Sequence, residues 1–153
     1  MVLNDEAEAF QLLLENAIPE LDSYTKDVVT DSLTDWLDED DEITRDGAED
    51  ADYSSLINPY LAANNAMASK SEIRLVNGVD PNWIMQLLPH ICVIPNFDVV
   101  QININTLTEE QAPVLAALTG INVDDAQSLI SSRPLAGFKD EQDFINDPVF
   151  GTE

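Results

Sequence analysis

Hydrophobic residues recur along this chain mostly at the three-to-four-residue spacing of amphipathic helices. Asn4 or Asp5 can cap a first helix, which Pro19 ends. A second helix is predicted from Glu20 to about Leu37. Its expected inward face consists of Leu21, Tyr24, Val28, Leu33, Trp36 and Leu37. Its expected polar face consists of Asp22, Lys26, Asp27 and Asp31.

Capping signals predict several shorter helices in the rest of the chain. Segments 69–72 and 108–111 both have the Ser/Thr-x-x-Glu/Gln spacing of a capping box, and Asp80 before Pro81 is a further helix start. Further helices are expected around 126–130 and 141–145. QININ, residues 101–105, alternates apolar and polar positions and is expected to form a short strand or an extended linker.

The predicted fold class is therefore mainly α, with little or no β structure, in two parts. Residues 1–95 are expected to form a helical subdomain that carries an acidic calcium loop at 35–53. Residues 96–150 are expected to form a short extended segment followed by a bundle of the SAM-like or helix-hairpin-helix type, because short helices there are joined by tight glycine turns. Residues 151–153 are assigned to a tail.

The acidic loop is the strongest chemical signal in the sequence. One base, Arg45, faces ten carboxylates: Asp35, Asp38, Glu39, Asp40, Asp41, Glu42, Asp46, Glu49, Asp50 and Asp52. The loop follows the C-terminal end of a helix, where the helix dipole already repels anions, so a bound cation is favoured. Oxygen ligands at about 2.3 to 2.6 Å are what Ca²⁺ selects, whereas Mg²⁺ demands a smaller octahedral site.

The acidic loop matches the calcium-binding loop of an EF-hand only in part. Numbering twelve residues from Asp38 places acids or oxygen donors at the ligand positions, but Ile43 stands where the EF-hand needs glycine and Arg45 where an apolar residue is usual. A different oxygen-rich loop is therefore expected, holding one or two structural Ca²⁺ ions. The alternative is a solvated acidic loop without any ion.

Net charge excludes several classes of partner. With 30 acids against 6 bases the chain carries −24, which repels nucleic acid and anionic membrane surfaces. Few cations follow Arg74, so the C-terminal helices are not expected to bind DNA. No apolar run is long enough to span a membrane.

Catalytic signals are weak. His90 is the only histidine and is interpreted as a packed or capping residue, and Cys92 is interpreted as a small buried hydrophobe. No catalytic residues and no organic cofactor are predicted, and the chain is not expected to be an enzyme. The alternative considered is a calcium-dependent hydrolase that uses loop carboxylates.

Five motifs, in order, resemble the α-helical domain of the GspK family, the large minor pseudopilin of the bacterial type II secretion system. They are D-W-L-D-x-D, G-A-E-D-x-x-Y, P-Y-x-x-A-N, S-E-I-R-x-V-x-G and I-N-x-N-T, and the resemblance covers about Thr30 to Phe150. Such an α-domain interrupts a pilin-like body with a membrane-anchored N-terminal helix, so this sequence looks like the inserted domain alone.

The resemblance implies a non-enzymatic component of the pseudopilus tip that takes part in protein secretion. Implied partners are the other minor pseudopilins of the I and J classes, together with exported substrates or the outer-membrane channel. The implied location is the periplasmic side of the inner membrane, the fragment itself being soluble. The family's acidic loop binds calcium, and the metal ligands implied here are Asp38, Asp40, Glu49 and Asp50, with Thr44 adding a backbone carbonyl.

Overall fold

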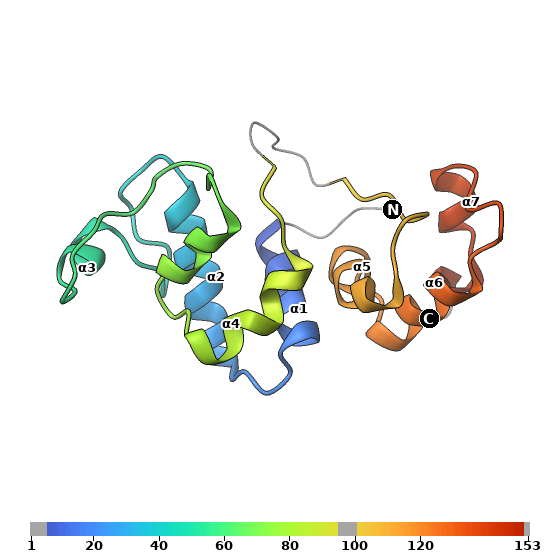
Figure 1. Cartoon of the computed structure of the whole chain (residues 1–153), viewed down its shortest axis with the longest axis horizontal. Coiled ribbons are helices and arrows are strands. Elements are labelled where there is room, and N and C mark those ends of the chain that lie inside the picture. The colour runs from blue at the N-terminus through green and yellow to red at the C-terminus, as the bar shows by residue number, and fades with distance from the viewer. Residues whose placement is uncertain (1–5, 95–100, 152–153) are drawn as a thin grey trace. The chain divides into compact units, whose positions relative to one another are not determined.

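The computed structural model describes residues 6–94 and 101–151, and within these ranges the regular structure is entirely helical (Figure 1). The chain divides into two compact units. One unit contains residues 17–98, and the other contains residues 1–16 together with 99–153. The expected first subdomain, 1–95, therefore differs from the observed unit, because residues 1–16 group with the C-terminal part of the chain.

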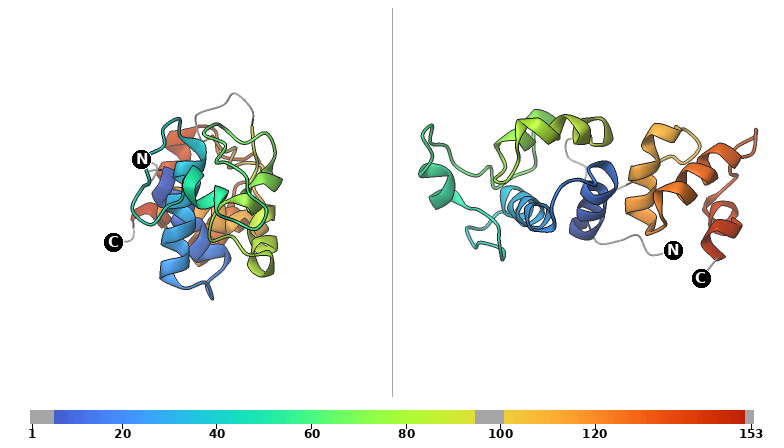
Figure 2. Two further views of the ribbon diagram at one scale, coloured as in Figure 1. Left: turned by 90° about the vertical axis from the view of Figure 1, so that its left-hand side faces the viewer. Right: turned by 90° about the horizontal axis from the view of Figure 1, so that it is seen from below.

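The unit of residues 17–98 is built on its longest helix, α2 (Ser23–Leu37), which lies beside the η1–α4 segment in both Figure 1 and Figure 2. The other elements are α3 (Asp50–Ser54), the 3₁₀ helix η1 (Lys70–Leu75), α4 (Pro81–Leu87) and η2 (Leu88–His90). The α2 helix begins three residues later than predicted because Asp22 is its cap, accepting a hydrogen bond from the Thr25 N–H at 3.0 Å.

The predicted inward face of α2 is wrong in several positions. Tyr24 is 66% exposed and Leu37 is 40% exposed. The buried residues of α2 are largely polar: Lys26, Val29, Thr30, Asp31, Ser32, Asp35 and Trp36. The prediction from hydrophobic spacing was wrong here because acids of α2 face the loop that follows the helix, where backbone N–H groups need acceptors.

The predicted start signals of η1 and α4 are confirmed. Ser69 and Glu72 form the capping box of η1, although the helix is 3₁₀ rather than α. Asp80 caps α4 by accepting from the Asn82 N–H, with Pro81 at the first helical position. Both helices turn large apolar side chains into the unit: Ile73, Trp83, Ile84 and Leu87.

The other unit contains α1 (Glu6–Ala17), whose last residue lies across the unit boundary, and five elements near the C-terminus. These are η3 (Glu109–Gln111), α5 (Ala112–Thr119), α6 (Val123–Ser132), α7 (Glu141–Ile145) and η4 (Pro148–Gly151). Gly120 ends α5 with φ at 75°, the left-handed conformation that glycine adopts without strain. The core consists of Leu107, Ala112, Leu115, Ala116, Ala126, Leu129, Ile130 and Phe144.

The segment 101–105 is extended and then turned, and it pairs with no strand among the described residues. Ile102 and Ile104 pack against the core, while the Asn105 side chain forms two hydrogen bonds with the backbone of Phe138, at 2.8 and 2.9 Å. The structure thus explains the second asparagine of the I-N-x-N-T motif: Asn105 joins segment 101–105 to the loop before α7.

Replacing Asn122 with alanine should cost about 1 kcal/mol of unfolding free energy, because its Oδ1 accepts the Asp125 N–H at 2.8 Å and satisfies the first turn of α6. Urea denaturation measures this loss. Gln127→Ala on the exposed side of the same helix is the control and should change stability by less. Equal stabilities for the two variants would contradict the capping role.

Candidate metal centre

The acidic loop is held on α2 by two buried aspartates one helical turn apart. Asp31 is 2% exposed; its Oδ1 pairs with Arg45 Nη2 at 2.6 Å and its Oδ2 accepts the Asp46 N–H at 3.3 Å. Asp35 is fully buried and accepts the Thr44 N–H, with N–O distances of 3.0 and 3.2 Å. Residues at i and i+4 lie on the same helix face, so both carboxylates meet the returning loop.

A close backbone approach at Gly47 completes this arrangement. The Gly47 N–H donates to the Thr44 carbonyl at 2.6 Å, which closes a tight turn around Arg45, a residue with φ at 38°. A Cβ at position 47 would lie 1.9 Å from Asp35 Oδ2 and 2.8 Å from the Thr44 oxygen. Only glycine therefore fits while Asp35 keeps its place.

After the turn, the short helix α3 fixes the loop to the rest of the unit through aromatic side chains. Tyr53 packs edge-on against Trp36, with ring centroids 5.2 Å apart, and stacks on Tyr60 at 5.3 Å. The Tyr53 hydroxyl accepts the Asn77 N–H at 3.2 Å, and the Tyr60 hydroxyl donates to the Leu75 carbonyl at 2.8 Å. Burial raises the pKa of Tyr53 to about 12.

Several side-chain oxygens in this region are buried and form no hydrogen bond of standard geometry with the described residues. They are Asp38 Oδ1, both carboxylate oxygens of Glu49, and Asn64 Oδ1. The Glu49 carboxylate nevertheless faces the backbone N–H of Asp52 in the capping box of α3. Glu49 is only 3% exposed. The Asn64 amide group is oriented by its Nδ2, which donates at 3.1 Å to the Asp40 carbonyl and to Asp41 Oδ1. A buried acceptor left without a donor costs about 1 to 3 kcal/mol, and more when it is charged.

Electrostatics at buried Glu49 and half-buried Asp38 also favours a positive partner. Burial raises the pKa of Glu49, a hydrogen bond from the Asp50 backbone partly opposes this, and the carboxylates of Asp35, Asp38 and Asp41 raise the pKa further. Burial likewise raises the pKa of Asp38, with additional repulsion from Asp40 and then Asp35. These mutual effects show that carboxylates from the end of α2 and from the start of α3 lie close enough to repel one another.

Of the five predicted metal ligands, Asp38 and Glu49 carry the unsatisfied oxygens. In each of the other three residues, one candidate ligand oxygen already accepts a hydrogen bond. Asp40 Oδ1 accepts the Glu42 N–H at 2.8 Å, Asp50 Oδ1 accepts the Ala62 N–H at 2.9 Å, and the Thr44 carbonyl accepts from Gly47. Each of these carboxylates keeps a second oxygen, and a carbonyl oxygen keeps a second lone pair, so the contacts do not exclude a ligand role.

Sequence reasoning missed three residues that shape this site: Asp31, Asp35 and Asn64. The four-residue spacing of Asp31 and Asp35 was a usable signal, since two acids one turn apart at the end of a helix face whatever loop follows it. Asn64 gave no such signal. It lies 15 residues after Glu49 and reaches the loop only through the folded path of segment 55–64.

The unsatisfied oxygens fit a hard cation in type, because carboxylate and amide oxygens are the ligands that Ca²⁺ prefers. Within the described part of the chain, however, no three or more His, Cys, Asp or Glu side chains converge into a group that could hold a metal ion. Asn64 is an amide and lies outside that set of residue types. Asp38, Glu49 and Asn64 thus offer oxygens of a suitable type, but the described residues show no group gathered around one ion position.

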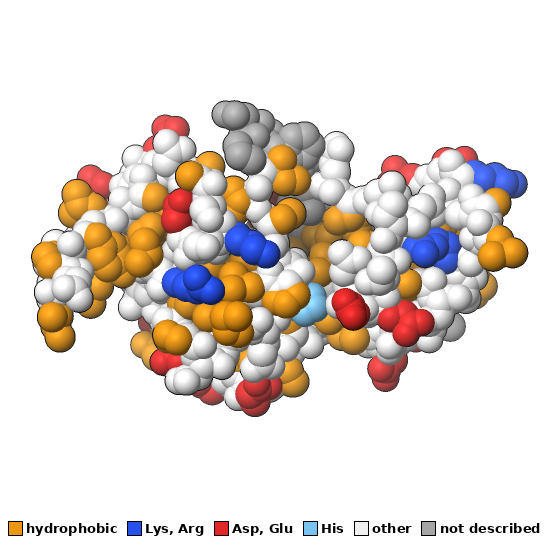
Figure 3. Space-filling view, viewed as in Figure 1, with side chains coloured by type: hydrophobic (Ala, Val, Ile, Leu, Met, Phe, Trp, Pro, Cys, Tyr) orange, Lys and Arg blue, Asp and Glu red, His pale blue; other side chains and the backbone are white. Residues whose placement is uncertain are grey.

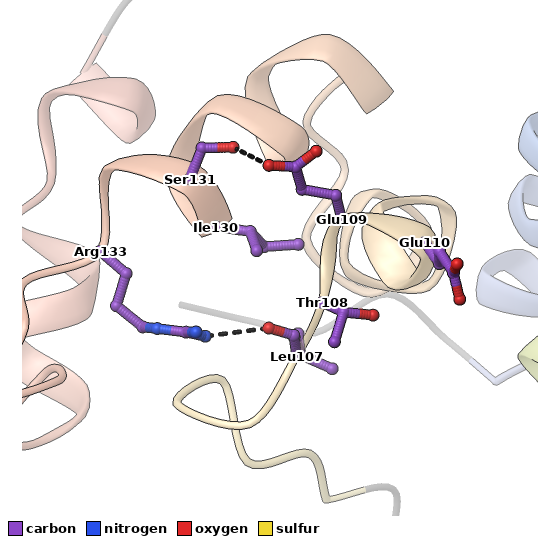
Figure 4. A pocket seen from close by; sticks show the side chains of 7 residues that line it. All are labelled: Leu107, Thr108, Glu109, Glu110, Ile130, Ser131 and Arg133. Carbon is purple, nitrogen blue, oxygen red and sulfur yellow. Dashed lines mark hydrogen bonds between the residues drawn. The ribbon is translucent and has the colours of Figure 1, made fainter.

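The described residues show no comparable set for catalysis. A hollow of about 560 Å³ is open and is lined by Leu107, Thr108, Glu109, Glu110, Ile130, Ser131 and Arg133 (Figure 4). Figure 4 shows Ser131 directed at Glu109 and Arg133 at the Leu107 carbonyl, at 2.8 and 3.0 Å. Both polar side chains are thus engaged in structural contacts, and no histidine lines the hollow to activate the serine.

His90 and Cys92 do not form a catalytic pair. Burial lowers the pKa of His90, and its Nδ1 is buried without a partner among the described residues. Cys92 is exposed, so its interpretation as a buried hydrophobe was wrong. Its neighbours Ile91 and Val93 are half-buried, and residues 91–94 follow η2 without regular structure.

The fold and the loop define a small helical protein module. Its described residues include an acidic loop rich in side-chain oxygens, and they show no cleft with a catalytic set of residues. Two models of the type II secretion system protein K family match the chain, one over residues 2–96 and one over residues 102–153. The chain belongs to the type II secretion system protein K family.

Similar proteins agree with this assignment. The chain is 41% identical over 134 residues to type II secretion system protein K of Pectobacterium carotovorum subsp. carotovorum, covering 86% of this chain and 40% of that protein. It is 39% identical over 138 residues to the protein K of Aeromonas hydrophila, covering 88% of this chain and 41% of that protein. The chain therefore spans about two fifths of the length of these relatives.

A crystal structure of the GspK–GspI–GspJ complex from enterotoxigenic Escherichia coli contains a chain of the same fold. The TM-score is 0.82 at 33% identity, covering 94% of this chain and 49% of that one. The predicted family and the mainly α fold class are confirmed. No helix among the described residues combines the length and the apolar character that crossing a bilayer requires.

Proposed function

We propose that this chain is a non-enzymatic structural module of the type II secretion pseudopilus tip. It acts in protein secretion on the periplasmic side of the inner membrane and assembles with minor pseudopilins of the I and J classes. Support comes from the family assignment and from the fold shared with one chain of a GspK–GspI–GspJ complex. The hydrolase alternative has no supporting observation, because the described residues contain no cleft with a spare carboxylate beside an activated nucleophile.

Calcium is proposed as the ion that completes the acidic loop. The observation that carries this proposal is the carboxylate of Glu49, which is buried, forms no hydrogen bond of standard geometry, and is repelled by the carboxylate of Asp38. Asp38 and Glu49 would supply charged oxygens and Asn64 a neutral one, with Asp40, Thr44 and Asp50 as further candidates. The ion would join the end of α2 to α3 and to segment 55–64, and would neutralise carboxylates that otherwise repel each other.

A secretion assay tests the proposed role. In an Aeromonas hydrophila strain lacking its own protein K, we expect secretion to be restored by a chimera whose matching segment is replaced with this chain. The readout is exported protein in the medium, and immunoblotting of the chimera confirms that it accumulates. A chimera present at the normal level that leaves the exported protein inside the cell would contradict the proposed function.

A further inference from the structure

A groove in the unit of residues 17–98 lies between two stretches of irregular chain. One wall is formed by α3 and the residues after it, including Leu56 and Tyr60, and the other by Arg74, Leu75 and Val79. Leu56 is 46% exposed and Leu75 is 43% exposed, so both walls offer apolar surface to solvent. The hydrogen bond from Tyr60 to the Leu75 carbonyl joins the two walls and keeps the groove in shape.

The groove has a volume of about 210 Å³. Sites for drug-sized molecules and cofactors generally enclose about 300 to 1,000 Å³ and hide most of the ligand. This groove is smaller than that and open on one side. Its dimensions suit one or two side chains of a protein segment laid across it, not a whole small molecule.

One cation, Arg74, lines the groove. A second, Lys70, stands four residues before it on η1, and both side chains are exposed. Lys70 Nζ donates to the Leu88 carbonyl at 3.1 Å, and Arg74 Nη2 lies 3.7 Å from the sulfur of Met85, a side chain that is 61% exposed. Figure 3 shows basic side chains on this face with apolar side chains between and around them.

Neither cation forms an ion pair with a carboxylate in the part of the chain that the structure describes. Asp52, which also lines the groove, accepts the Glu49 N–H at 3.1 Å, and Glu72 and Asp80 cap their helices. In a chain with 30 acids and 6 bases, two unpaired cations on one apolar face are conspicuous. The described chain therefore supplies no anionic partner for the positive charge of this face.

We propose that this groove docks a segment of another protein that presents a carboxylate beside a bulky apolar side chain. The apolar side chain would enter between Leu56 and Leu75, and the carboxylate would meet the Arg74 guanidinium, whose planar fork suits a carboxylate. A partner protein is favoured over an anionic membrane or a second copy of this chain, because the net charge of −24 repels an extended anionic surface while a short acidic segment experiences mainly the local cations.

The test uses the full chain and a fluorescein-labelled peptide of repeated leucine–aspartate pairs separated by glycine. Fluorescence anisotropy should show saturable binding, and none for the same peptide with lysine in place of aspartate. Arg74→Glu should weaken binding by about tenfold or more, and Lys70→Glu should weaken it less. Lys139→Glu makes the same charge change on an exposed lysine of the other unit and should leave binding unchanged.

Three results would overturn the docking proposal. One is the absence of saturable binding to the aspartate peptide while circular dichroism shows a folded protein. Another is an equal loss of binding in Arg74→Glu and Lys139→Glu, which would indicate a nonspecific charge effect. The third is binding to phosphatidylglycerol vesicles, or self-association in sedimentation equilibrium, that Arg74→Glu abolishes, because the occupant would then be a membrane or a second copy.

Discussion

Replacing Glu49 with glutamine is expected to change stability in opposite directions with and without calcium. In EDTA the wild-type carboxylate is buried, forms no hydrogen bond of standard geometry, and is repelled by Asp35, Asp38 and Asp41. Glutamine removes the charge at nearly constant volume, so the variant should unfold at a higher temperature than the wild type. The expected gain is about 1 to 3 kcal/mol, the cost of a buried polar group without a partner.

In calcium the order should reverse. A ligand that binds only the folded state at one thousand times its dissociation constant adds about 4.1 kcal/mol of stability, more than the roughly 1 to 3 kcal/mol that the substitution gains in EDTA. The wild type should gain unfolding free energy of this order from calcium. Glu49→Gln should lose most of that gain, because the charged carboxylate that would bind the ion is gone. Thermal unfolding of both proteins in EDTA and in CaCl₂ measures the four stabilities.

Glu42→Gln is the matched control for this experiment. Glu42 lies in the same loop and carries the same charge, but its side chain is exposed. This variant should therefore respond to calcium almost as the wild type does. If Glu49→Gln kept the full calcium response, Glu49 would not be a ligand, and the proposed centre would lose its principal residue.

Gly47→Ala is expected to destabilise the protein by about 1 to 3 kcal/mol, the usual cost of inserting atoms where no space exists. The new methyl group would overlap Asp35 Oδ2 and crowd the Thr44 carbonyl. Asp35 cannot move away freely, because it is fully buried and accepts the Thr44 N–H. The loss should appear in urea denaturation both with and without calcium, since the clash is steric.

The control for this substitution is Gly151→Ala. A Cβ at Gly151 would have no heavy atom within 4 Å, so the same chemical change should alter stability by less than about 0.5 kcal/mol. If Gly47→Ala were as stable as Gly151→Ala, Asp35 would not hold the loop in the way described.

Local signals predicted the helices well because each depends on neighbouring residues only. The capping boxes at 69–72 and 108–111 and the Asp80–Pro81 start all occur as predicted. The one helix in the loop, α3, was not predicted, since its five residues are too few to show a hydrophobic period. Its formation depends on Tyr53, which is anchored by Trp36, Tyr60 and Asn77.

The candidate site could be predicted only in part. The density of acids indicated a cation, and Asp38 and Glu49 are the buried, unsatisfied members of that set. The hydrophobic period of α2 could not reveal that Asp31 and Asp35 point inward, because their burial is compensated by N–H groups of the loop and by Arg45, partners 9 to 15 residues away. Asn64 was hidden for the same reason, being brought to the loop by tertiary structure.

Calcium binding to the acidic loop of this protein K family member should be visible in the thermal unfolding of the unmodified chain, compared in EDTA, in CaCl₂ and in MgCl₂ at equal ionic strength. We expect the unfolding temperature to rise with calcium concentration and to saturate, with a much smaller effect of magnesium. If the unfolding temperature were the same in EDTA and in calcium, the loop would not be completed by this ion.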